Sequence, residues 1–152
     1  MAKGIVTPEL IEQLKAIVGE KYVYTDKDKL EPYSHDEVTD PHYMKEPQVV
    51  VLPANTEEVA KVVKLCYDND TVMVPRAAGT GLAAGAVATF GGVIISIERM
   101  NKILEIDKQN MVCVTEPGVT TAVLQEEVQK EGLFYGGDPC SGDSCFIGGN
   151  VA

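Results

Sequence analysis

The sequence predicts an α+β fold of two lobes. A small parallel βαβ lobe of α/β type comes first, and a lobe with a β-hairpin and a helix follows. Residues 47–100 alternate short apolar runs with a helical pattern, whereas residues 101–131 place two strand patterns before a helix. We therefore expect an N-terminal helix and connector over 1–46, a first lobe over 47–100 and the start of a second lobe over 101–152.

The N-terminal segment begins with a helix signal. Thr7 and Pro8 are residue types that start helices, and Gly19 is a type that ends them. Apolar residues recur between them at helical spacing, so a helix is predicted over 7–19. Residues 22–24 are expected to form a short extended piece. Residues 25–46 are polar, which predicts a surface connector of the kind that is more often variable than functional.

The first lobe is predicted from apolar runs. Residues 47–53 form one between two prolines, which is typical of a short buried strand. Thr56 precedes two glutamates and is the expected N-cap of a helix that ends near residue 70. Residues 71–74 and 92–97 are two further strands. A right-handed crossover then places the segment after residue 74 at the carboxyl edge of a parallel sheet, where α/β proteins bind ligands.

The pattern changes near residue 100. Residues 101–107 and 111–116 are predicted to form a hairpin with its turn at 107–110. Pro117 and Gly118 interrupt this pattern, and Thr120 or Thr121 is then expected to cap a helix that ends near residue 131. We expect the glycine-rich segments of the two lobes to face the seam between them.

The most informative stretch is the loop over residues 75–85, PRAAGTGLAAG. Glycine and alanine leave backbone N–H groups unshielded, so such a loop can contact a phosphate closely. The spacing of Gly79, Gly81 and Gly85 is one residue longer than the Rossmann fingerprint, no long helix follows, and the Gly-Lys pair of a P-loop is absent. A structural turn without a ligand is the alternative interpretation at this point.

Arginine is rare in this chain and occurs only at Arg76, inside the loop, and at Arg99. A guanidinium in a glycine-rich loop suits an anionic ligand, because arginine pairs bidentately with phosphate or carboxylate. A surface ion pair is the alternative for Arg76.

Composition excludes several functions. The net charge of −10 makes a nucleic-acid backbone a poor partner. No transmembrane run and no signal peptide are recognisable, so a cytoplasmic protein with reduced thiols is expected. Cys140 and Cys145 are too far apart for a C-x-x-C pair and have no histidine nearby, so no metal site is expected. His35 and His42 are expected to be solvated loop residues.

Three motifs in fixed order indicate a family. They are Val74 to Leu82 (VPRAAGTGL), Glu116 to Val119 (EPGV) and Asp138 to Ala152 (DPCSGDSCFIGGNVA). Together they resemble the FAD-binding domain of flavin-linked 2-hydroxyacid dehydrogenases, the group of the glycolate oxidase D subunit and D-lactate dehydrogenase. This domain type is named after p-cresol methylhydroxylase and vanillyl-alcohol oxidase. The resemblance covers residues 47–152. By itself, the run Gly148-Gly149-Asn150 would be interpreted as a turn.

The resemblance implies a set of cofactor contacts. Residues 76–82 would wrap the FAD diphosphate, and residues 117–118 would line the cleft. Asp138, Pro139 and Ser144 would lie along the ribityl chain and the isoalloxazine, and residues 147–150 with Ala152 would contact the flavin and the diphosphate. The implied residues are Pro75, Arg76, Ala77, Ala78, Gly79, Thr80, Gly81, Leu82, Pro117, Gly118, Asp138, Pro139, Ser144, Ile147, Gly148, Gly149, Asn150 and Ala152. Thr80 stands where relatives with covalent flavin have histidine, so non-covalent FAD is expected.

The resemblance also implies a reaction. The whole enzyme would transfer a hydride from a small D-2-hydroxyacid to FAD and pass electrons to a quinone, an iron–sulfur subunit or an electron-transferring flavoprotein. The family's enzymes are much longer, so the chain is expected to be an N-terminal fragment with an incomplete second lobe, inactive alone and without a general base. The alternatives are a non-catalytic module that self-associates as a homo-oligomer, or another flavin enzyme such as an alditol oxidase or an ether-lipid synthase.

Overall fold

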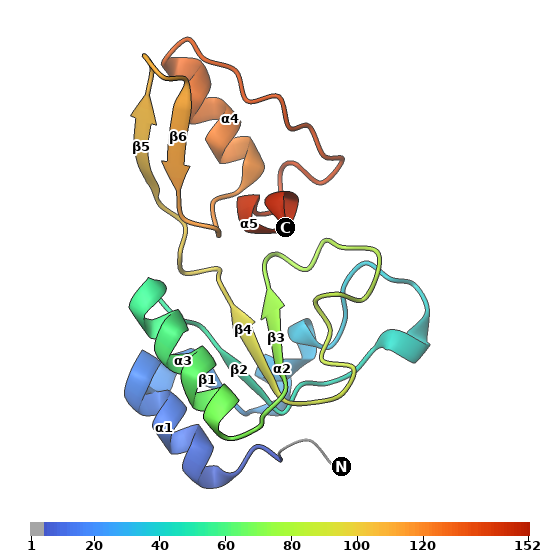
Figure 1. The fold of residues 1–152 in the computed structure, drawn as a ribbon. Coiled ribbons are helices and arrows are strands. Elements are labelled where there is room, and N and C mark those ends of the chain that lie inside the picture. The colour runs from blue at the N-terminus through green and yellow to red at the C-terminus, as the bar shows by residue number, and fades with distance from the viewer. Residues whose placement is uncertain (1–4) are drawn as a thin grey trace.

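A computed structural model describes residues 5–152. The first four residues, where the predicted N-terminal segment begins, lie outside the described part. The first lobe contains a four-stranded sheet in the order β1-β2-β4-β3. Its strands are β1 (Val23–Tyr24), β2 (Val49–Val51), β3 (Met73–Arg76) and β4 (Val93–Ser96). β4 lies between β2 and β3 and runs parallel to both, whereas β1 adds an antiparallel edge (Figure 1). The predicted strands are confirmed with one shift: β3 continues through Pro75 and Arg76, which were predicted to lie in the loop, because both pair with β4.

Two helices cover one face of this sheet: α1 (Pro8–Val18) and α3 (Thr56–Asp68). Leu14 and Val62 from these helices are fully buried against Val49 and Val51 of β2. Val50, between them, points to the opposite face because side chains alternate along a strand, and it packs there with Leu30 and Ile94. Both faces of the strand are therefore buried, as its continuous apolar sequence predicts.

The helix ends follow the expected chemistry with one correction. Thr7 caps α1 by accepting a hydrogen bond from the Leu10 N–H, and Gly19 ends it. The N-cap of α3 is Asn55, and the prediction that Thr56 is the cap is wrong. The Asn55 side chain accepts a hydrogen bond from the Glu58 N–H at 2.9 Å, so Thr56 becomes the first helical residue.

The connector is more than a surface loop. It contains a short helix α2 (Lys27–Leu30) and two 3₁₀ turns, η2 (Glu31–Tyr33) and η3 (Pro41–Tyr43). Leu30 and Asp36 are buried. Figure 1 shows the cyan part of this segment beside the yellow-green loop that follows β3, and the N–H of Glu37 donates to the carbonyl of Gly81 at 3.0 Å. The predicted variable surface segment therefore supports the glycine-rich loop.

The second lobe consists of the hairpin β5 (Ile103–Asp107) and β6 (Val112–Thr115), the helix α4 (Thr121–Lys130) and the short helix α5 (Ile147–Val151). The Asp107 carboxylate accepts hydrogen bonds from the N–H groups of Gln109 and Asn110, which closes the predicted turn. Val119, Leu124 and Val128 form the core of this lobe. The turn interpretation of Gly148-Gly149-Asn150 is wrong, because these residues lie within α5.

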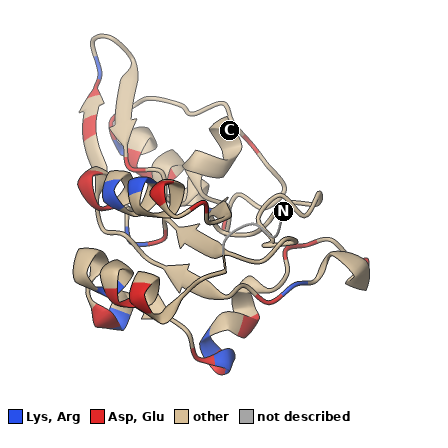
Figure 2. Cartoon of the chain, turned by 60° about the horizontal axis from the view of Figure 1, so that its bottom comes forward, with Lys and Arg blue, Asp and Glu red and all other residues tan. Residues whose placement is uncertain are grey.

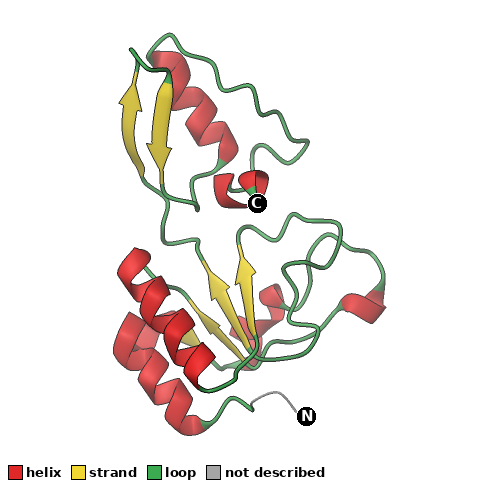
Figure 3. Ribbon diagram, viewed as in Figure 1, coloured by secondary structure: helices red, strands yellow, loops and turns green. Residues whose placement is uncertain are grey.

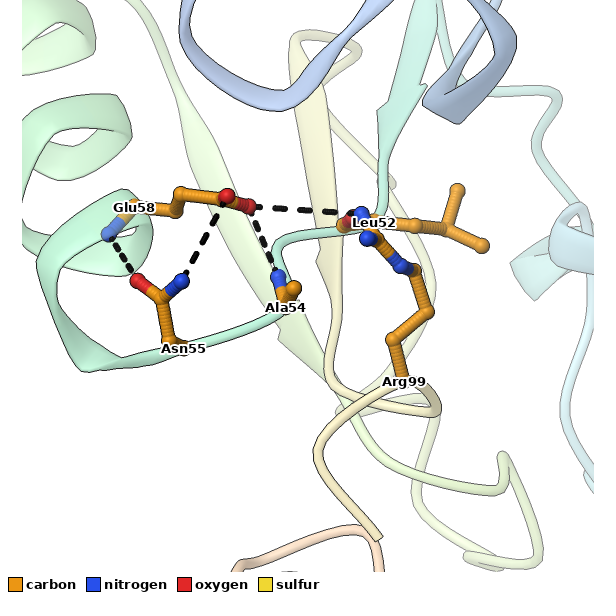
Figure 4. Close-up of polar contacts among 5 residues, drawn as sticks. All are labelled: Leu52, Ala54, Asn55, Glu58 and Arg99. Carbon is orange, nitrogen blue, oxygen red and sulfur yellow. Dashed lines mark hydrogen bonds and ion pairs between the residues drawn. The ribbon is translucent and has the colours of Figure 1, made fainter.

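Arg99 joins elements at the carboxyl edge of the sheet. Its guanidinium donates to the Leu52 carbonyl at 2.6 Å and lies 4.0 Å from the carboxylate of Glu58, which also accepts from the Ala54 N–H (Figure 4). The same guanidinium stacks on the ring of Tyr22, 3.2 Å from its centroid. Arg99 thus links the end of β2 to the start of α3.

Among residues 5–152, no helix has the length and apolar character that a membrane span requires.

Candidate functional site

A cleft of about 590 Å³ lies where the first lobe meets the second. One wall is the loop after β3, and the other is α5 with the segment before it; both elements can be followed in Figure 1. Pro117, from the turn between β6 and α4, and Ile97, just after β4, contribute to the lining. The cleft is therefore at the carboxyl edge of the parallel strands, where the sequence predicts a ligand site.

The loop after β3 keeps its backbone open. Residues 77–92 form no helix or strand, which Figure 3 shows as continuous loop between β3 and β4. Within the described part of the chain, the N–H groups of residues 78–86 donate no hydrogen bond to another residue. Backbone donors in a loop are normally paired or solvated, so this row of N–H groups is available to an anion.

Charge is distributed in a way that favours an anionic ligand. The chain has 23 acidic and 13 basic residues, yet the described residues that line the cleft include neither Asp nor Glu. Figure 2 shows charged residues on the helices and on the hairpin. Because an anion is repelled by carboxylates at short range, an acid-free cleft in an acidic protein is a specific feature rather than a consequence of composition.

Arg76 does not make the ion pair that the sequence suggests. The residue is 7% exposed, and its guanidinium donates to the carbonyl oxygens of His35 (2.8 Å), Ala86 (3.1 Å) and Pro32 (3.1 Å). Burial lowers its pKa, while the neighbouring Tyr33, Asp36 and Glu98 act in the opposite direction. The interpretation of Arg76 as part of a surface ion pair is therefore wrong. The guanidinium is directed at backbone carbonyls rather than at an incoming anion.

The wall formed by the second lobe is tightly packed. The N–H of Gly148 donates to the Pro117 carbonyl at 2.8 Å, and a Cβ at Gly148 would lie 2.8 Å from the Cβ of Pro117. The Asn150 amide donates to the Thr121 hydroxyl, whose oxygen lies 3.2 Å from the sulfur of Cys145. Glycine is therefore required where α5 contacts Pro117, and the polar contacts fix α5 against α4.

Cys145 belongs to this buried polar group. Burial raises the pKa of its thiol, but hydrogen bonds from Thr121, Ser141 and Asn150 outweigh this and lower the pKa overall. The residue is 3% exposed, so its role in the structure is packing beside the cleft. Among residues 5–152 no group of three or more His, Cys, Asp or Glu side chains is placed to hold a metal ion.

Comparison with known proteins identifies the family. The pattern of the FAD binding domain matches residues 47–152 of this chain. The chain belongs to this FAD-binding family. The match begins at the first strand of the βαβ lobe and includes the glycine-rich loop and both walls of the cleft, so the predicted family is confirmed.

Curated relatives have the same domain in longer proteins. D-lactate dehydrogenase of Anaerostipes hadrus is 44% identical over 149 residues, which are 97% of this chain and 30% of that protein. Glycolate oxidase subunit GlcD of Bacillus subtilis is 36% identical over 97% of this chain and 31% of its own length. D-2-hydroxyglutarate dehydrogenase of Stutzerimonas stutzeri is 38% identical, with 95% and 31% covered. The chain thus spans about 30% of the length of these relatives.

Solved structures confirm the fold. An alkyldihydroxyacetonephosphate synthase superposes with a TM-score of 0.84 at 26% identity, covering 94% of this chain and 31% of that one. p-Cresol methylhydroxylase with substrate bound superposes with a TM-score of 0.72 at 26% identity, covering 82% of this chain and 25% of that one. The fold is therefore that of part of the FAD-binding domain type named after p-cresol methylhydroxylase.

The residues of the cleft fit FAD on physical grounds. A diphosphate needs donors and close backbone approach, which the unpaired N–H groups of residues 78–86 and the small side chains at Ala77, Ala78 and Gly79 provide. Across the cleft, a Cβ at Gly149 would lie 3.5 Å from the Cβ of Ala77, so the two walls approach each other closely.

Most of the predicted cofactor residues are brought together here. Those that line the cleft are Pro75, Arg76, Ala77, Ala78, Gly79, Thr80, Gly81, Pro117, Gly148, Gly149, Asn150 and Ala152. The structure thus brings together residues of all three motifs, the first and third of which lie more than sixty residues apart in the sequence, counted from Gly81 to Gly148.

The other predicted residues lie elsewhere among the described residues. Leu82 is 79% exposed and points away from the lining, Gly118 is buried behind Pro117, and Ile147 packs on the core of the second lobe. Asp138, Pro139 and Ser144 belong to the loop between α4 and α5 and do not line the cleft. A contact between these residues and FAD stays a prediction.

Several lining residues were not among the predicted set: Gly85, Ala86, Ile97, Ser141, Cys145 and Phe146. Gly85 and Ala86 continue the same glycine-rich loop, and Ser141, Cys145 and Phe146 lie within the third motif, so position in a motif could have found them. Ile97 carries no sequence signal, because it enters the lining only through the path of the chain after β4.

Proposed function

We propose that this chain is the FAD-binding part of a flavin-dependent D-2-hydroxyacid dehydrogenase, and that it holds FAD non-covalently. The observation that carries the proposal is the acid-free cleft beside a row of unpaired N–H groups in a protein of net charge −10. Because the chain belongs to the FAD-binding family, we infer that the anionic ligand is FAD.

In this proposal the two walls have different tasks. The loop over residues 77–86 binds the diphosphate through backbone N–H groups, which favour a negative charge without a charged side chain. The wall that contains Gly148 and Gly149 faces the ring system, and the close contact of Gly148 with Pro117 supports that wall. Thr80 lacks the imidazole through which some relatives link their flavin, which supports non-covalent binding. When bound, FAD supplies the hydride acceptor.

The substrate class is proposed from the relatives. Their names designate D-lactate, glycolate and D-2-hydroxyglutarate as substrates, each a small 2-hydroxyacid. The Bacillus subtilis relative is named as a glycolate oxidase subunit, which supports a protein partner that receives the electrons. We propose that oxidation of the hydroxyacid also requires parts of the parent enzyme outside this chain, because the chain spans about 30% of the relatives.

The first test is a visible absorption spectrum of the purified chain after FAD is added and excess ligand is removed by desalting. Flavin absorbance that stays with the protein supports the proposal. A colourless protein that fails to retain FAD in a direct titration contradicts binding by this chain alone. Denaturation with acid then separates the modes, since non-covalent flavin appears in the supernatant and covalent flavin precipitates with the protein.

The second test concerns the substrate and uses the longest form of the protein that carries this domain. Loss of flavin absorbance under anaerobic conditions on addition of D-lactate, glycolate or D-2-hydroxyglutarate supports the 2-hydroxyacid class, with L-lactate as the matched control. If only a long-chain alcohol and an acylated dihydroxyacetone phosphate react with the protein, the ether-lipid synthase alternative is correct. That alternative is favoured by one observation: the chain superposes on an alkyldihydroxyacetonephosphate synthase with a TM-score of 0.84.

A third outcome would favour a binding module without catalysis. Self-association in sedimentation velocity without any FAD retention supports the module. Exposed apolar side chains on the second lobe, such as Met111, Val112 and Phe134, supply the surface that such association would use.

A further inference from the structure

The glycine-rich loop is held from behind by a segment that precedes it by some forty residues in the sequence. We call residues 32–38 the strap. Arg76 is the centre of the contact: Nη1 donates to the carbonyls of His35 in the strap and Ala86 in the loop, and Nη2 donates to Pro32 in the strap. One guanidinium therefore joins Pro32 and His35 of the strap to Ala86 of the loop.

The contact continues beyond Arg76. The N–H of Glu37 donates to the Gly81 carbonyl at 3.0 Å, in the middle of the loop. Because a trans peptide places its C=O and N–H on opposite sides, a carbonyl that faces the strap leaves the next N–H facing away from it. The strap thus binds the loop carbonyl of Gly81, and Arg76 binds that of Ala86, while the N–H groups of residues 78–86 donate no hydrogen bond within the described part of the chain.

The strap is itself fixed by buried polar groups. The Asp36 carboxylate accepts from the Val38 N–H at 3.0 Å through Oδ1. Its Oδ2 is buried, has no hydrogen-bond partner among residues 5–152, and lies 4.0 Å from the position of a Cβ on Gly81. The Tyr33 hydroxyl donates to Glu98, just after β4, and the Tyr33 ring centroid lies 5.5 Å from the Arg76 guanidinium carbon. The strap cannot move from Arg76 without disturbing these contacts.

We propose that Arg76 is a positioning residue for cofactor binding: its guanidinium holds the strap and the loop together and so keeps the loop N–H groups arranged for the diphosphate, without itself bonding to it. This deepens the proposed function and rests on it. Arginine suits the task because its planar fork presents several fixed donors at once, whereas the lysine ammonium is a single point charge.

The proposal predicts that charge alone does not replace the guanidinium. Arg76→Lys keeps the positive charge but not the fork, and Arg76→Met removes both. Both variants should weaken FAD binding at least about tenfold, since each loses charge-assisted hydrogen bonds that order the loop. In hydrogen exchange of the ligand-free protein, both should raise exchange at the hydrogen-bonded amides of the strap, Glu37 and Val38, and at those that follow the unpaired part of the loop, Val87 and Gly91, while the core strand β2 remains protected.

Arg99→Met is the matched control. Arg99 also donates to a backbone carbonyl (Figure 4) and stacks on a tyrosine, but it is not among the residues that line the cleft. This variant should lower the thermal midpoint and leave both FAD affinity and loop exchange as in the parent. Gly79→Ala is a second perturbation of the same contact, since its Cβ would lie 2.6 Å from the guanidinium carbon.

Two results would overturn the proposal. If FAD affinity falls in Arg76→Met but survives in Arg76→Lys, with loop exchange unchanged in both, the guanidinium acts on the ligand by charge. If loop exchange rises while FAD affinity is unchanged, the ordered loop is not needed for the cofactor. Failure of the parent protein to bind FAD would contradict the proposed function instead, and the exchange data would then decide separately whether Arg76 holds the loop.

Discussion

Gly79 leaves the space that the Arg76 guanidinium occupies. A Cβ on Gly79 would lie 2.6 Å from the guanidinium carbon, and Gly79 has a φ of +76°, which side-chain-bearing residues rarely adopt. The first glycine of the loop and the buried arginine are therefore one structural unit. The glycine is needed for the hydrogen bonds of its neighbour as well as for a ligand's approach.

Gly79→Ala is expected to lower both stability and FAD affinity. The positive φ costs an alanine about 1–2 kcal/mol, and displacement of the guanidinium adds to this. We expect a loss of about 2 kcal/mol or more in the free energy of unfolding, measured in urea. Gly132→Ala isolates the contact, because Gly132 has the same φ of +76° with nothing within 4 Å of its added Cβ. Equal losses in both variants would contradict the role of Arg76.

Gly81→Val should separate ligand binding from folding. Gly81 is exposed, lines the cleft, and its added Cβ would meet only the Asp36 carboxylate at 4.0 Å. The free energy of unfolding should therefore change by no more than about 0.5 kcal/mol. The branched side chain should abolish FAD binding in the full-length enzyme, measured as flavin per protein after desalting. Retained flavin at normal stoichiometry would reject the loop assignment, and Gly136→Val, outside the cleft, serves as the control.

Gly118→Ala is expected to disturb the junction between the lobes. The added Cβ would collide with the Ile97 carbonyl and lie 2.7 Å from the Met100 carbonyl, and both obstacles are backbone atoms that cannot rotate away. The Gly118 N–H also donates to the Met100 carbonyl at 2.7 Å. We expect a destabilisation of about 2–3 kcal/mol in urea unfolding. Gly85→Ala should be neutral, since nothing lies within 4 Å of its added Cβ.

Cys66 should make the protein less stable at alkaline pH. Burial in α3 raises the pKa of its thiol from 9.0 to about 11, so the folded protein retains a proton that the unfolded chain has released in this range. The free energy of unfolding should therefore fall by about 1.4 kcal/mol per pH unit between about pH 9 and 11, and this contribution is fully present below pH 9. Urea unfolding at several pH values measures the slope.

The matched variants for this slope are Cys66→Ala and Cys140→Ala. The first removes the titrating buried thiol, so its slope between about pH 9 and 11 should be flatter than that of the parent. The second removes an exposed thiol and should leave the slope unchanged. A slope that persists in Cys66→Ala would assign the alkaline instability to other groups.

The strands and long helices were predictable because their signals are local. The apolar run before Pro53, the helical spacing after Thr7 and the turn residues at 107–110 each act within a few residues, and all three elements form where expected. The helix α5 was not predictable in this way. Gly148 and Gly149 disfavour a helix by themselves, and α5 forms against Pro117 and Thr121, which lie far away in the sequence.

The sequence by itself determined the family and the glycine-rich loop, because three ordered motifs specify the backbone that can approach a phosphate. Only the tertiary structure decided what Arg76 does and what the strap is for. A guanidinium can pair with an anion or donate to carbonyls, and the choice depends on which groups the fold brings within hydrogen-bond distance of it. Here those groups are the carbonyls of His35, Ala86 and Pro32, from segments whose proximity no local pattern reveals.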